Sequence, residues 1–587
     1  MYYYNFGRTR GLRKVKMKPR DIRFAYPDAP REQLVLYAVS VDETVSKDDP
    51  VRTLAALLDE VDWTQWENAY AGFGQPAIYP RYLAGAILLG LLYKVRSTRE
   101  LERAARKNLD FIWLLEGFTP DHSTFALFQK RHAESIAELN RHMARKLVAK
   151  REKTLLQLII DGTRLRADSA RQGARTAQFI EAVIEELDRR LEQLKQEEQP
   201  PAPQPDYLEG MAPAENAQEQ VAQLDKQIVQ LQTKRQKYQH ALDIARQRDA
   251  RAKQHNGENA APVRVPITDP ESQITPNKEG GFAPNYTPVA AVEPQTGAIV
   301  YGDVLAGSDE AAAVLPAVAA SATVIEQTPG AVVADSNFAS GEVLEALHAG
   351  GIDAYMPTRS MSPPNNSALR PDPAMPVAGQ DLARLPRHGG KFARTAFVYD
   401  PATDTYHCPM GHALTPYKKG KDSRGSACTY YQCPCCPDCP LASDCIKAKT
   451  RYRTITRDQY EHLREAASQR LSTDIGKAIY RGRAPGIESV FGILKRTLGI
   501  RHFRLRGLAN VKTEWAWICT AYNLKKLLKT SNEHDAKHAQ EPPRQLIQPT
   551  LGLISTYRYA QPLRNVFTAC IKITRIPCVT PYYKCAA

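Results

Sequence analysis

The chain has 587 residues, more than one ordinary domain contains, so we expect several domains or one domain with large insertions. Hydrophobic residues make up 43% of it and aromatic residues 8%, which permits sizeable cores and excludes a globally disordered protein. The 79 Lys and Arg residues outnumber the 64 Asp and Glu residues, and the net charge of +15 favours a polyanionic partner, nucleic acid above all. A basic but unspecialised protein is the alternative.

The sequence contains no segment with the length of a membrane span or the layout of a secretion signal. The most apolar run, Leu83 to Tyr93, has about half of the roughly 20 residues that a bilayer crossing needs, so we expect a buried helix and no membrane partner. The first 20 residues hold seven basic residues and no apolar segment, which predicts either an arm that contacts phosphates or a solvated tail. Most cysteines cluster between Cys408 and Cys445, which is typical of metal binding in a reducing compartment, so we expect a cytoplasmic protein.

The N-terminal quarter of the chain has the periodicity of helices. Pro80 can open one helix, and Ser97 with Glu100 three residues later forms the capping box of another. Residues 120–124 break the chain before a further helix. Short helices with interspersed arginines predict a helix-turn-helix-like DNA-binding domain within residues 1–150, and a helical bundle with ordinary surface arginines is the alternative.

After this region the pattern changes to that of a mixed α/β core. The run LLQLIID predicts a buried strand that ends in Asp161. Two further strands, YTPVAAVE and AIVYGDVL, are joined by turn residues, and GAVVADSN predicts another buried strand that ends in Asp335. Helices near 309–322 and 341–350 and the short strand DAYMP complete a mixed sheet.

Two insertions interrupt this core. Residues 170–255 carry two runs of heptad-like spacing around the segment QPPAPQP, which predicts a coiled-coil hairpin with a proline-rich tip. Proline-rich loops and the cysteine cluster occupy 361–452, and the helical signal then runs from Tyr460 to Lys529 with one break. We therefore expect a helical domain over 1–150, a first core segment over 151–360, a Cys-rich insertion over 361–452, a final core segment over 453–530, and a weakly patterned tail over 531–587.

Asp161, Asp335 and Glu488 are the candidate catalytic residues. Two strand-end carboxylates that share a cleft need a cation, and Mg²⁺ suits them because it takes carboxylate, water and phosphate oxygens. Two such ions about 4 Å apart can clamp an in-line phosphoryl transfer. Glu488 stands among twelve Lys and Arg residues between Lys477 and Lys529, where the only other acid is Glu514. It is either a metal ligand or the salt-bridge partner of Arg483 or Lys495.

A family resemblance rests on these residues. Tyr480-x2-Arg483-x4-Glu488-x6-Lys495, followed by Phe503-x2-Arg506-Gly507, resembles the C-terminal signature of DDE transposases of bacterial insertion sequences. The segments IIDGTRLRADSA and VVADSNFASGEVLEAL resemble those around the first and second aspartates of the family, although Asn337-Phe338 stands where Gly-Tyr is frequent. DDPVRTL, YPRYLAGAILLGLL, STRELERA and PDHSTFALFQKRH resemble the N-terminal transposase domain.

The resemblance implies a ribonuclease-H-like core in which Asp161, Asp335 and Glu488 hold two Mg²⁺ or Mn²⁺ ions. It implies cleavage at transposon ends and attack of the freed 3′-hydroxyl on target DNA. Tyr480, Arg483, Lys495 and Arg506 would contact the DNA. The implied partners are terminal inverted repeats, target DNA and a second copy of the chain on the nucleoid. A catalytically silent DNA-binding protein and a nuclease without strand transfer are the alternatives.

The cysteine cluster has the spacing of a zinc site. Cys408, Cys436, Cys439 and Cys445 are the preferred ligands for a tetrahedral zinc ion, with Cys433 or His412 as substitutes. We expect the zinc ion to have a structural role, because we expect this insertion to be poor in strands and to have little apolar core of its own. Free thiols in a reduced loop are the alternative.

Overall fold

A computed structural model describes residues 40–70, 76–151, 156–197, 215–277, 280–307, 309–363, 365–421, 425–447 and 450–540. The chain divides into the units Met1–Asn532 and Glu533–Ala587, and the second adds only the end of one helix to the described residues. The predicted basic arm, the proline-rich tip and most of the C-terminal tail lie outside this range. Within it, no helix combines the length and the apolar character that a bilayer crossing requires.

The helices predicted near the N-terminus are confirmed. Pro80 is the first residue of its helix, and Ser97 and Glu100 form the expected capping box. Asp49 and Asp121 cap two more helices through their side chains. The bounds are α1 Val41–Thr44, α2 Pro50–Asp59, α3 Thr64–Glu67, α4 Pro80–Leu92, α5 Thr98–Lys107, α6 Leu109–Leu114, α7 His122–Arg131 and α8 Ala133–Val148.

A seven-stranded mixed sheet forms the centre of the first unit. Its strands are β1 Gln157–Gly162, β2 Leu165–Arg166, β5 Gln273–Pro276, β6 Phe282–Glu293, β7 Ala298–Leu305, β8 Ala331–Val333 and β9 Asp353–Tyr355. Strand β6 pairs antiparallel with both β7 and β1, while β1 and β8, and then β8 and β9, pair in parallel. Each strand predicted from a buried apolar run is therefore confirmed, as is the hairpin of β6 and β7.

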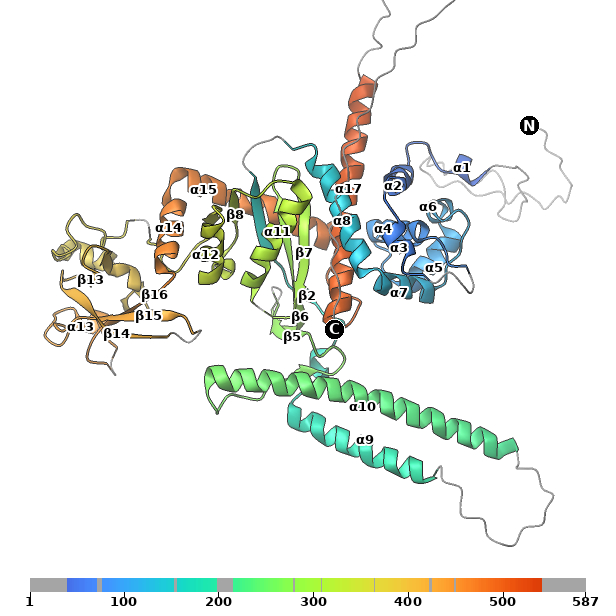
Figure 1. Ribbon diagram of the computed structural model, residues 1–587, viewed down its shortest axis with the longest axis horizontal. Helices are drawn as coiled ribbons and strands as arrows, with labels where there is room; N and C mark the ends of the chain where they lie inside the picture. The colour runs from blue at the N-terminus through green and yellow to red at the C-terminus, as the bar shows by residue number, and fades with distance from the viewer. Residues whose placement is uncertain are drawn as a thin grey trace, which may run out of the picture. The chain divides into compact units, whose positions relative to one another are not determined.

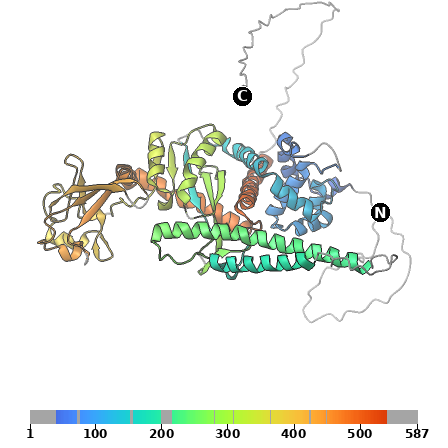
Figure 2. The same cartoon turned by 60° about the horizontal axis from the view of Figure 1, so that its bottom comes forward.

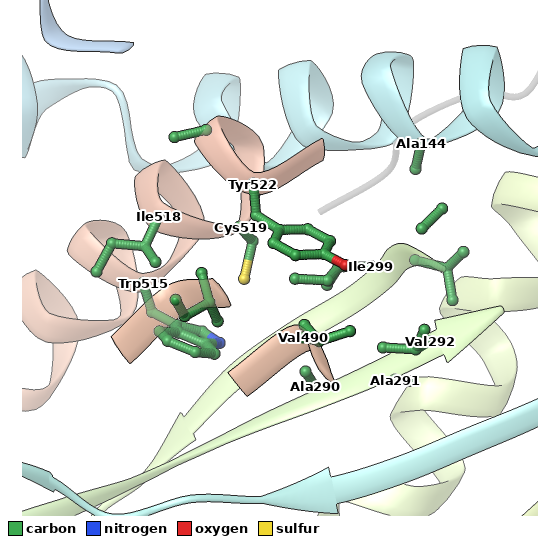
Figure 3. Packing of buried hydrophobic residues seen from close by; sticks show 14 of the residues in the cluster. Ala144, Ala290, Ala291, Val292, Ile299, Val490, Trp515, Ile518, Cys519 and Tyr522 are labelled. Carbon is green, nitrogen blue, oxygen red and sulfur yellow. The ribbon is translucent and has the colours of Figure 1, made fainter. Parts of the chain in front are cut away.

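Helices on the sheet and the N-terminal helices share one hydrophobic core. The sheet helices are α11 Val314–Ile325, α12 Gly341–Ala349, α14 Glu461–Ser472 and α17 Leu508–Gln540, with the short turns η2 Glu310–Ala313 and η3 Ser336–Phe338. Figure 3 shows Trp515, Cys519 and Tyr522 of α17 directed at Ala290 and Ile299 of the β6–β7 hairpin. On another side of α17, the ring of Trp517 meets that of Trp66 edge-on, 6.0 Å between centroids.

Two long helices form the hairpin that the sequence predicts between β2 and β6. Helices α9 Ala177–Glu197 and α10 Glu215–Asn256 run side by side in both views (Figures 1 and 2). Two apolar clusters join them, one around Ile180 and Leu242 and one around Leu194 and Ile228. The short strands β3 Ala174–Arg175 and β4 Val265–Pro266 pair at their base, beside the turn η1 Arg171–Gly173. The coiled-coil geometry stays a prediction.

The Cys-rich segment contains a second sheet with a hydrophobic core of its own, so the expectation of a strand-poor insertion is wrong. Five antiparallel strands form the sheet: β12 Val398–Asp400, β13 Thr405–His407, β14 Ala413–Lys421, β15 Ala427–Gln432 and β16 Thr454–Asp458. The hairpin β10 Arg387–His388 and β11 Lys391–Phe392, the turns η4 Gly379–Arg384 and η5 Arg394–Ala396, and α13 Ala442–Cys445 surround it. Phe392, Tyr406, Leu414 and Tyr431 are buried inside. The strand signal is weak because the outer faces carry polar and basic residues.

The C-terminal helical region has more breaks than predicted. Helices α14 and α15 Asp474–Arg481 are separated at Thr473, and residues 498–507 interrupt the path before α17. Between these breaks lie two π-helical turns, η6 Ala484–Glu488 and η7 Ile493–Thr497, around α16 Ser489–Gly492. The prediction of one break is therefore wrong, and a Pro at position 485 inside η6 explains the irregular turn there.

The buried amide of Asn523 provides a test of this architecture. Its Nδ2 donates to Asn140 Oδ1 of α8 and to the Ile299 carbonyl of β7, and its Oδ1 accepts from the Ile299 amide, each at 2.9 Å. Asn523→Ala leaves these three buried groups unpaired, so we expect the free energy of unfolding to fall by about 3 kcal/mol. Urea unfolding followed by tryptophan fluorescence measures this, with Asn510→Ala on the same helix as control. Equal effects of the two substitutions would contradict the assignment.

Candidate functional site

The parallel pairing of β1 with β8 brings Asp161 and Asp335 together. Leu158 lies opposite Val332 and Ile159 opposite Val333, and Asp161 and Asp335 each follow two residues after this last pair, close enough for their charges to act on each other. Neighbouring strands are about 4.8 Å apart. Both acids therefore stand at the carboxyl ends of adjacent strands, on the same edge of the sheet, as the sequence predicted for each strand separately.

Each of these carboxylates already accepts hydrogen bonds. Arg483 Nη1 donates to Asp161 Oδ2 at 2.9 Å, and the Gly162 amide donates to Asp161 Oδ1 at 2.8 Å. The amide of Asn337 donates to Asp335 Oδ1 at 2.8 Å, which caps η3. Burial raises the pKa of Asp161, and the nearby charge of Asp335 raises it further, while Arg483 and the Gly162 amide lower it; burial prevails.

Glu488 lies at the end of η6, a turn that packs against β1. A Cβ at Gly486 would lie 2.6 Å from Ile159 Cδ1, which shows how closely this turn packs against the strand. Glu488 itself is exposed. The structure thus brings Asp161 and Asp335 together and places Glu488 on the adjoining turn. Nowhere in the described ranges do three His, Cys, Asp or Glu side chains stand close enough to hold a metal ion as they are placed.

A further acid, Glu310, lies at this site and was missed in the sequence. A Cβ added at Gly162 would lie 2.7 Å from Glu310 Oε1, and Asn337 Nδ2 donates to Glu310 Oε2 at 3.3 Å. Burial raises the pKa of Glu310, and the charges of Asp335 and Asp161 add to the rise. The sequence shows only that an acid follows the β6–β7 hairpin. This signal is weak, because the sequence does not reveal where the turn that carries the acid packs.

The predicted DNA-binding residues fall into two groups. Tyr480 and Arg483 belong to the aspartate site, with the guanidinium of Arg483 5.8 Å from the centre of the Tyr480 ring. Lys495 and Arg506 line a groove beside it, of about 860 Å³. Lys495 Nζ donates to Thr163 Oγ1, and Arg506 Nε donates to Asp168 Oδ2 at 2.8 Å. The cations that line the groove are Arg164, Arg166, Lys495, Arg496, Arg501 and Arg506.

The donor chemistry of the aspartate site fits a hard divalent cation. Asp161, Asp335 and Glu310 offer carboxylate oxygens whose charges act on one another, and such oxygens are the ligands that Mg²⁺ and Mn²⁺ prefer. The charge of Arg483 occupies this position in the structure by pairing with Asp161. The carboxylates of this site therefore attract a cation.

Two family models match the chain. The model described as Transposase DDE domain matches residues 407–528, and the one described as Transposase domain (DUF772) matches residues 39–131. These matches are consistent with a DDE-type transposase of an insertion element. The DDE match includes Glu488 and the cysteine cluster, whereas Asp161 and Asp335 lie before it. Searches of curated proteins and of solved structures gave no match.

The matched family models indicate a general class of chemistry. A DDE transposase is a transposition enzyme that acts on DNA, and enzymes of this kind generally use divalent metal ions. The strong positive charge of the transposase and the basic groove agree with such a partner.

The pairing of Arg483 with Asp161 predicts a change in pH dependence. Arg483 lowers the pKa of Asp161 against the effect of burial, so Arg483→Gln raises that pKa further. Metal binding needs the ionised carboxylate, and the acidic limb of kcat/KM for DNA cleavage should therefore move to higher pH. Arg481→Gln, an exposed arginine on α15, is the matched control and should leave the limb in place. An unshifted limb in Arg483→Gln would exclude this electrostatic role.

Proposed function

We propose that this transposase cuts DNA at the ends of its insertion sequence and joins the freed 3′-hydroxyl to target DNA. The observation that carries the proposal is that Asp161 at the end of β1 and Asp335 just after the parallel strand β8 lie close together, with the Glu488 turn packed on β1. In-line phosphoryl transfer requires carboxylates that hold divalent ions next to a path for the DNA backbone. The aspartate pair and the adjoining basic groove meet both requirements.

The sheet supports a ribonuclease-H-like core. An antiparallel hairpin lies on one side of β1, and two parallel strands lie on the other. We propose the domain boundaries given by the sequence, with one change: a DNA-binding helical domain over 1–150, core segments over 151–360 and 459–530, the hairpin insertion over 170–255, and a Cys-rich insertion that extends from 361 past the predicted limit of 452, because β16 Thr454–Asp458 pairs with β15. The tail over 531–587 is assigned no function.

Asp161, Asp335 and Glu488 would hold Mg²⁺ or Mn²⁺, two ions in all, which would supply a nucleophilic oxygen and stabilise the leaving 3′-oxygen. Arg483 would exchange its bond to Asp161 for a phosphate oxygen, which keeps its charge paired throughout. Tyr480, next to Arg483, offers a ring on which a base can stack. Glu310 and Asn337 would keep the loop after β8 in place, because they are joined by a hydrogen bond.

Double-stranded DNA, both terminal repeats and target, would follow the basic groove lined by Lys495 and Arg506. Two ends have to be cut and joined, so the active complex would contain two copies of the chain, acting in the cytoplasm on the nucleoid. A nuclease without strand transfer would use the same residues, and a silent DNA-binding protein would use the groove alone. Joined products separate the first proposal from both of these.

Removal of either aspartate should abolish cleavage and leave DNA binding. Asp161→Asn and Asp335→Asn each remove several kcal/mol of charge stabilisation, so we expect at least about a thousandfold loss in cleavage rate. Labelled DNA that carries the flanking ends of the element, incubated with Mg²⁺ and sized on a denaturing gel, reports cleavage and joining. Asp353→Asn, at the start of β9 in the same sheet, is the matched control.

Two outcomes would contradict the proposal. If Asp335→Asn cleaved DNA at the normal rate, the assignment of Asp335 would be wrong. If the wild type bound the ends specifically but did not cut them, with Mn²⁺ as well as Mg²⁺, the protein would be a catalytically silent DNA-binding protein.

The basic groove predicts a salt-dependent contribution to DNA affinity. Arg496 and Arg501 are exposed and line the groove, so their joint replacement by Ala should not disturb packing. The plot of log K against log salt should become shallower by up to about 1.8, or 0.9 for each phosphate group that the protein no longer neutralises. Filter binding at several salt concentrations measures the slope. The control, Arg189→Ala with Arg190→Ala on α9, removes the same charge at another place. If the control changed the salt slope by the same amount, the proposal that DNA binds in the groove would be wrong.

A further inference from the structure

Four cysteines from three separate segments converge on one small cavity in the Cys-rich segment. Cys408 follows β13, Cys436 and Cys439 lie in the turn after β15, and Cys445 ends α13. All four line a cavity of about 20 Å³. A cavity of this size has room for one water-sized particle and no more. The segment therefore gathers its thiols around space for a single small ion.

The surroundings of the cavity are apolar. Phe392, Phe397 and Leu414 line it together with the cysteines, and none of the described cysteines forms a disulfide. Cys408, Cys436 and Cys445 are buried and line this cavity, and Cys439 is partly exposed.

The turn at Cys408 is built to present its sulfur. The Cys408 amide donates to the His412 carbonyl at 3.0 Å, and the Gly411 amide donates to the Cys408 carbonyl at 2.8 Å. Gly411 has φ +82°, and a Cβ there would lie 2.1 Å from the Ala374 carbonyl oxygen, so only glycine fits. The backbone amides of Met410 and His412 donate to the Cys408 sulfur, although burial still raises the pKa of this thiol.

Arg453 supplies positive charge on the opposite side. Its backbone amide donates to Cys436 Sγ at 3.4 Å, and its Nη1 donates to the Cys445 carbonyl at 3.2 Å. Its Nε is buried and has no hydrogen-bond partner among the described residues. A buried donor without a hydrogen-bond partner lowers the stability of the fold by about 1–3 kcal/mol. Deprotonation of the neighbouring thiols would give the Nε of Arg453 an anionic acceptor.

We propose that Cys408, Cys436, Cys439 and Cys445 bind one structural zinc ion as thiolates, with Arg453 as the cation that offsets the negative charge of the cluster. Binding releases the four thiol protons and leaves a complex of net charge −2, which the Arg453 guanidinium partly neutralises. Because the sulfurs are not yet at ligand distance from one another, binding has to rotate thiol side chains on turns that are already formed. The ion would tie the β13–β14 turn to the loop between β15 and β16.

Other candidate ligands fit less well. Cys435 and His412 line the cavity but are exposed, and Cys428 lies in β15 and does not line it. Cys433 is buried and lines the cavity, so it is the closest competitor. We prefer Cys439 because it lies in the same turn as Cys436, with the C-x2-C spacing of a zinc knuckle, and its amide donates to the Cys436 carbonyl at 3.3 Å.

Zinc content of the purified full-length protein tests the proposal. Plasma mass spectrometry after dialysis should find close to one zinc per chain, and Cys408→Ser, Cys436→Ser, Cys439→Ser and Cys445→Ser should each lose it. Cys428→Ser and Cys435→Ser are matched controls that should keep it. A wild type without zinc would overturn the proposal, as would zinc kept by Cys439→Ser and lost from Cys433→Ser.

Cobalt substitution covers variants that fail to fold. Co²⁺ added to the zinc-depleted wild type should give the charge-transfer bands and intense visible absorption of a tetrahedral four-thiolate site. A weak octahedral spectrum would overturn the proposal whatever the variants do.

Arg453→Gln tests the part played by the arginine. Loss of a partner of this kind typically weakens metal binding 10–100-fold, so competition with a chelator should show zinc affinity lower by about that factor. Arg451→Gln, two residues away and exposed, is the control and should match the wild type. Equal zinc affinity in Arg453→Gln and wild type would remove Arg453 from the site. None of these measurements depends on DNA cleavage, so they stand or fall apart from the proposed transposition activity.

Discussion

The in-register parallel pairing of β1 with β8 is the constraint on which the functional arrangement depends. It places two carboxylates at adjacent strand ends, where ionised groups repel each other and where burial already raises the pKa of Asp161. Such a pair is stable only beside positive charge or backbone donors. The fold supplies both, Arg483 to Asp161 and a backbone amide to Asp335. In the free protein, the guanidinium of Arg483 balances the charge of Asp161. In the proposed reaction, a metal ion would take the place of this guanidinium, which would then bind a phosphate group.

Arg483 pairs with Asp161 from 322 positions farther along the chain, and the packing of α17 helps to keep these elements in place. Its buried face covers the β6–β7 hairpin, while Trp517 meets Trp66 and Glu514 pairs with Arg96 at 3.0 Å. Burial raises the pKa of Glu514, but the backbone amide of Leu505 and the charge of Arg96 oppose the rise. This pairing joins the N-terminal helices to the chain just after the site. The N-terminal transposase match and the part of the DDE match from Tyr460 onward thus share one hydrophobic core, while the Cys-rich part of the DDE match has its own.

Local patterns in the sequence predict what local forces determine. Buried apolar runs that end in an acid predicted β1 and β8 with Asp161 and Asp335, and Ser97 with Glu100 predicted a capping box, because burial and capping act over a few residues. The position of Glu310 beside Gly162 could not be predicted, since it depends on how η2 packs against a strand 150 residues earlier. The sheet of the Cys-rich segment was missed because a strand such as Ala413–Lys421 buries few of its side chains. The π-helical turn at Glu488 has no sequence signal apart from its proline and glycine.

The two proposed metal sites use opposite ligand chemistries, and this keeps the ions apart. Carboxylate oxygens at a strand edge open to DNA suit Mg²⁺ or Mn²⁺, which retain water and accept phosphate oxygens as further ligands. Thiolates in a closed apolar cavity suit zinc, which needs no open position in a structural site. In the proposed reaction, Asp161 would lose its contact with Arg483 at the first site. At the second site, the zinc ion would keep the same four thiolate ligands throughout and would stabilise the fold of the Cys-rich segment. Under these proposals, the carboxylates at the strand ends would select the catalytic metal ion, and the cysteines in the tight turns would select the structural one.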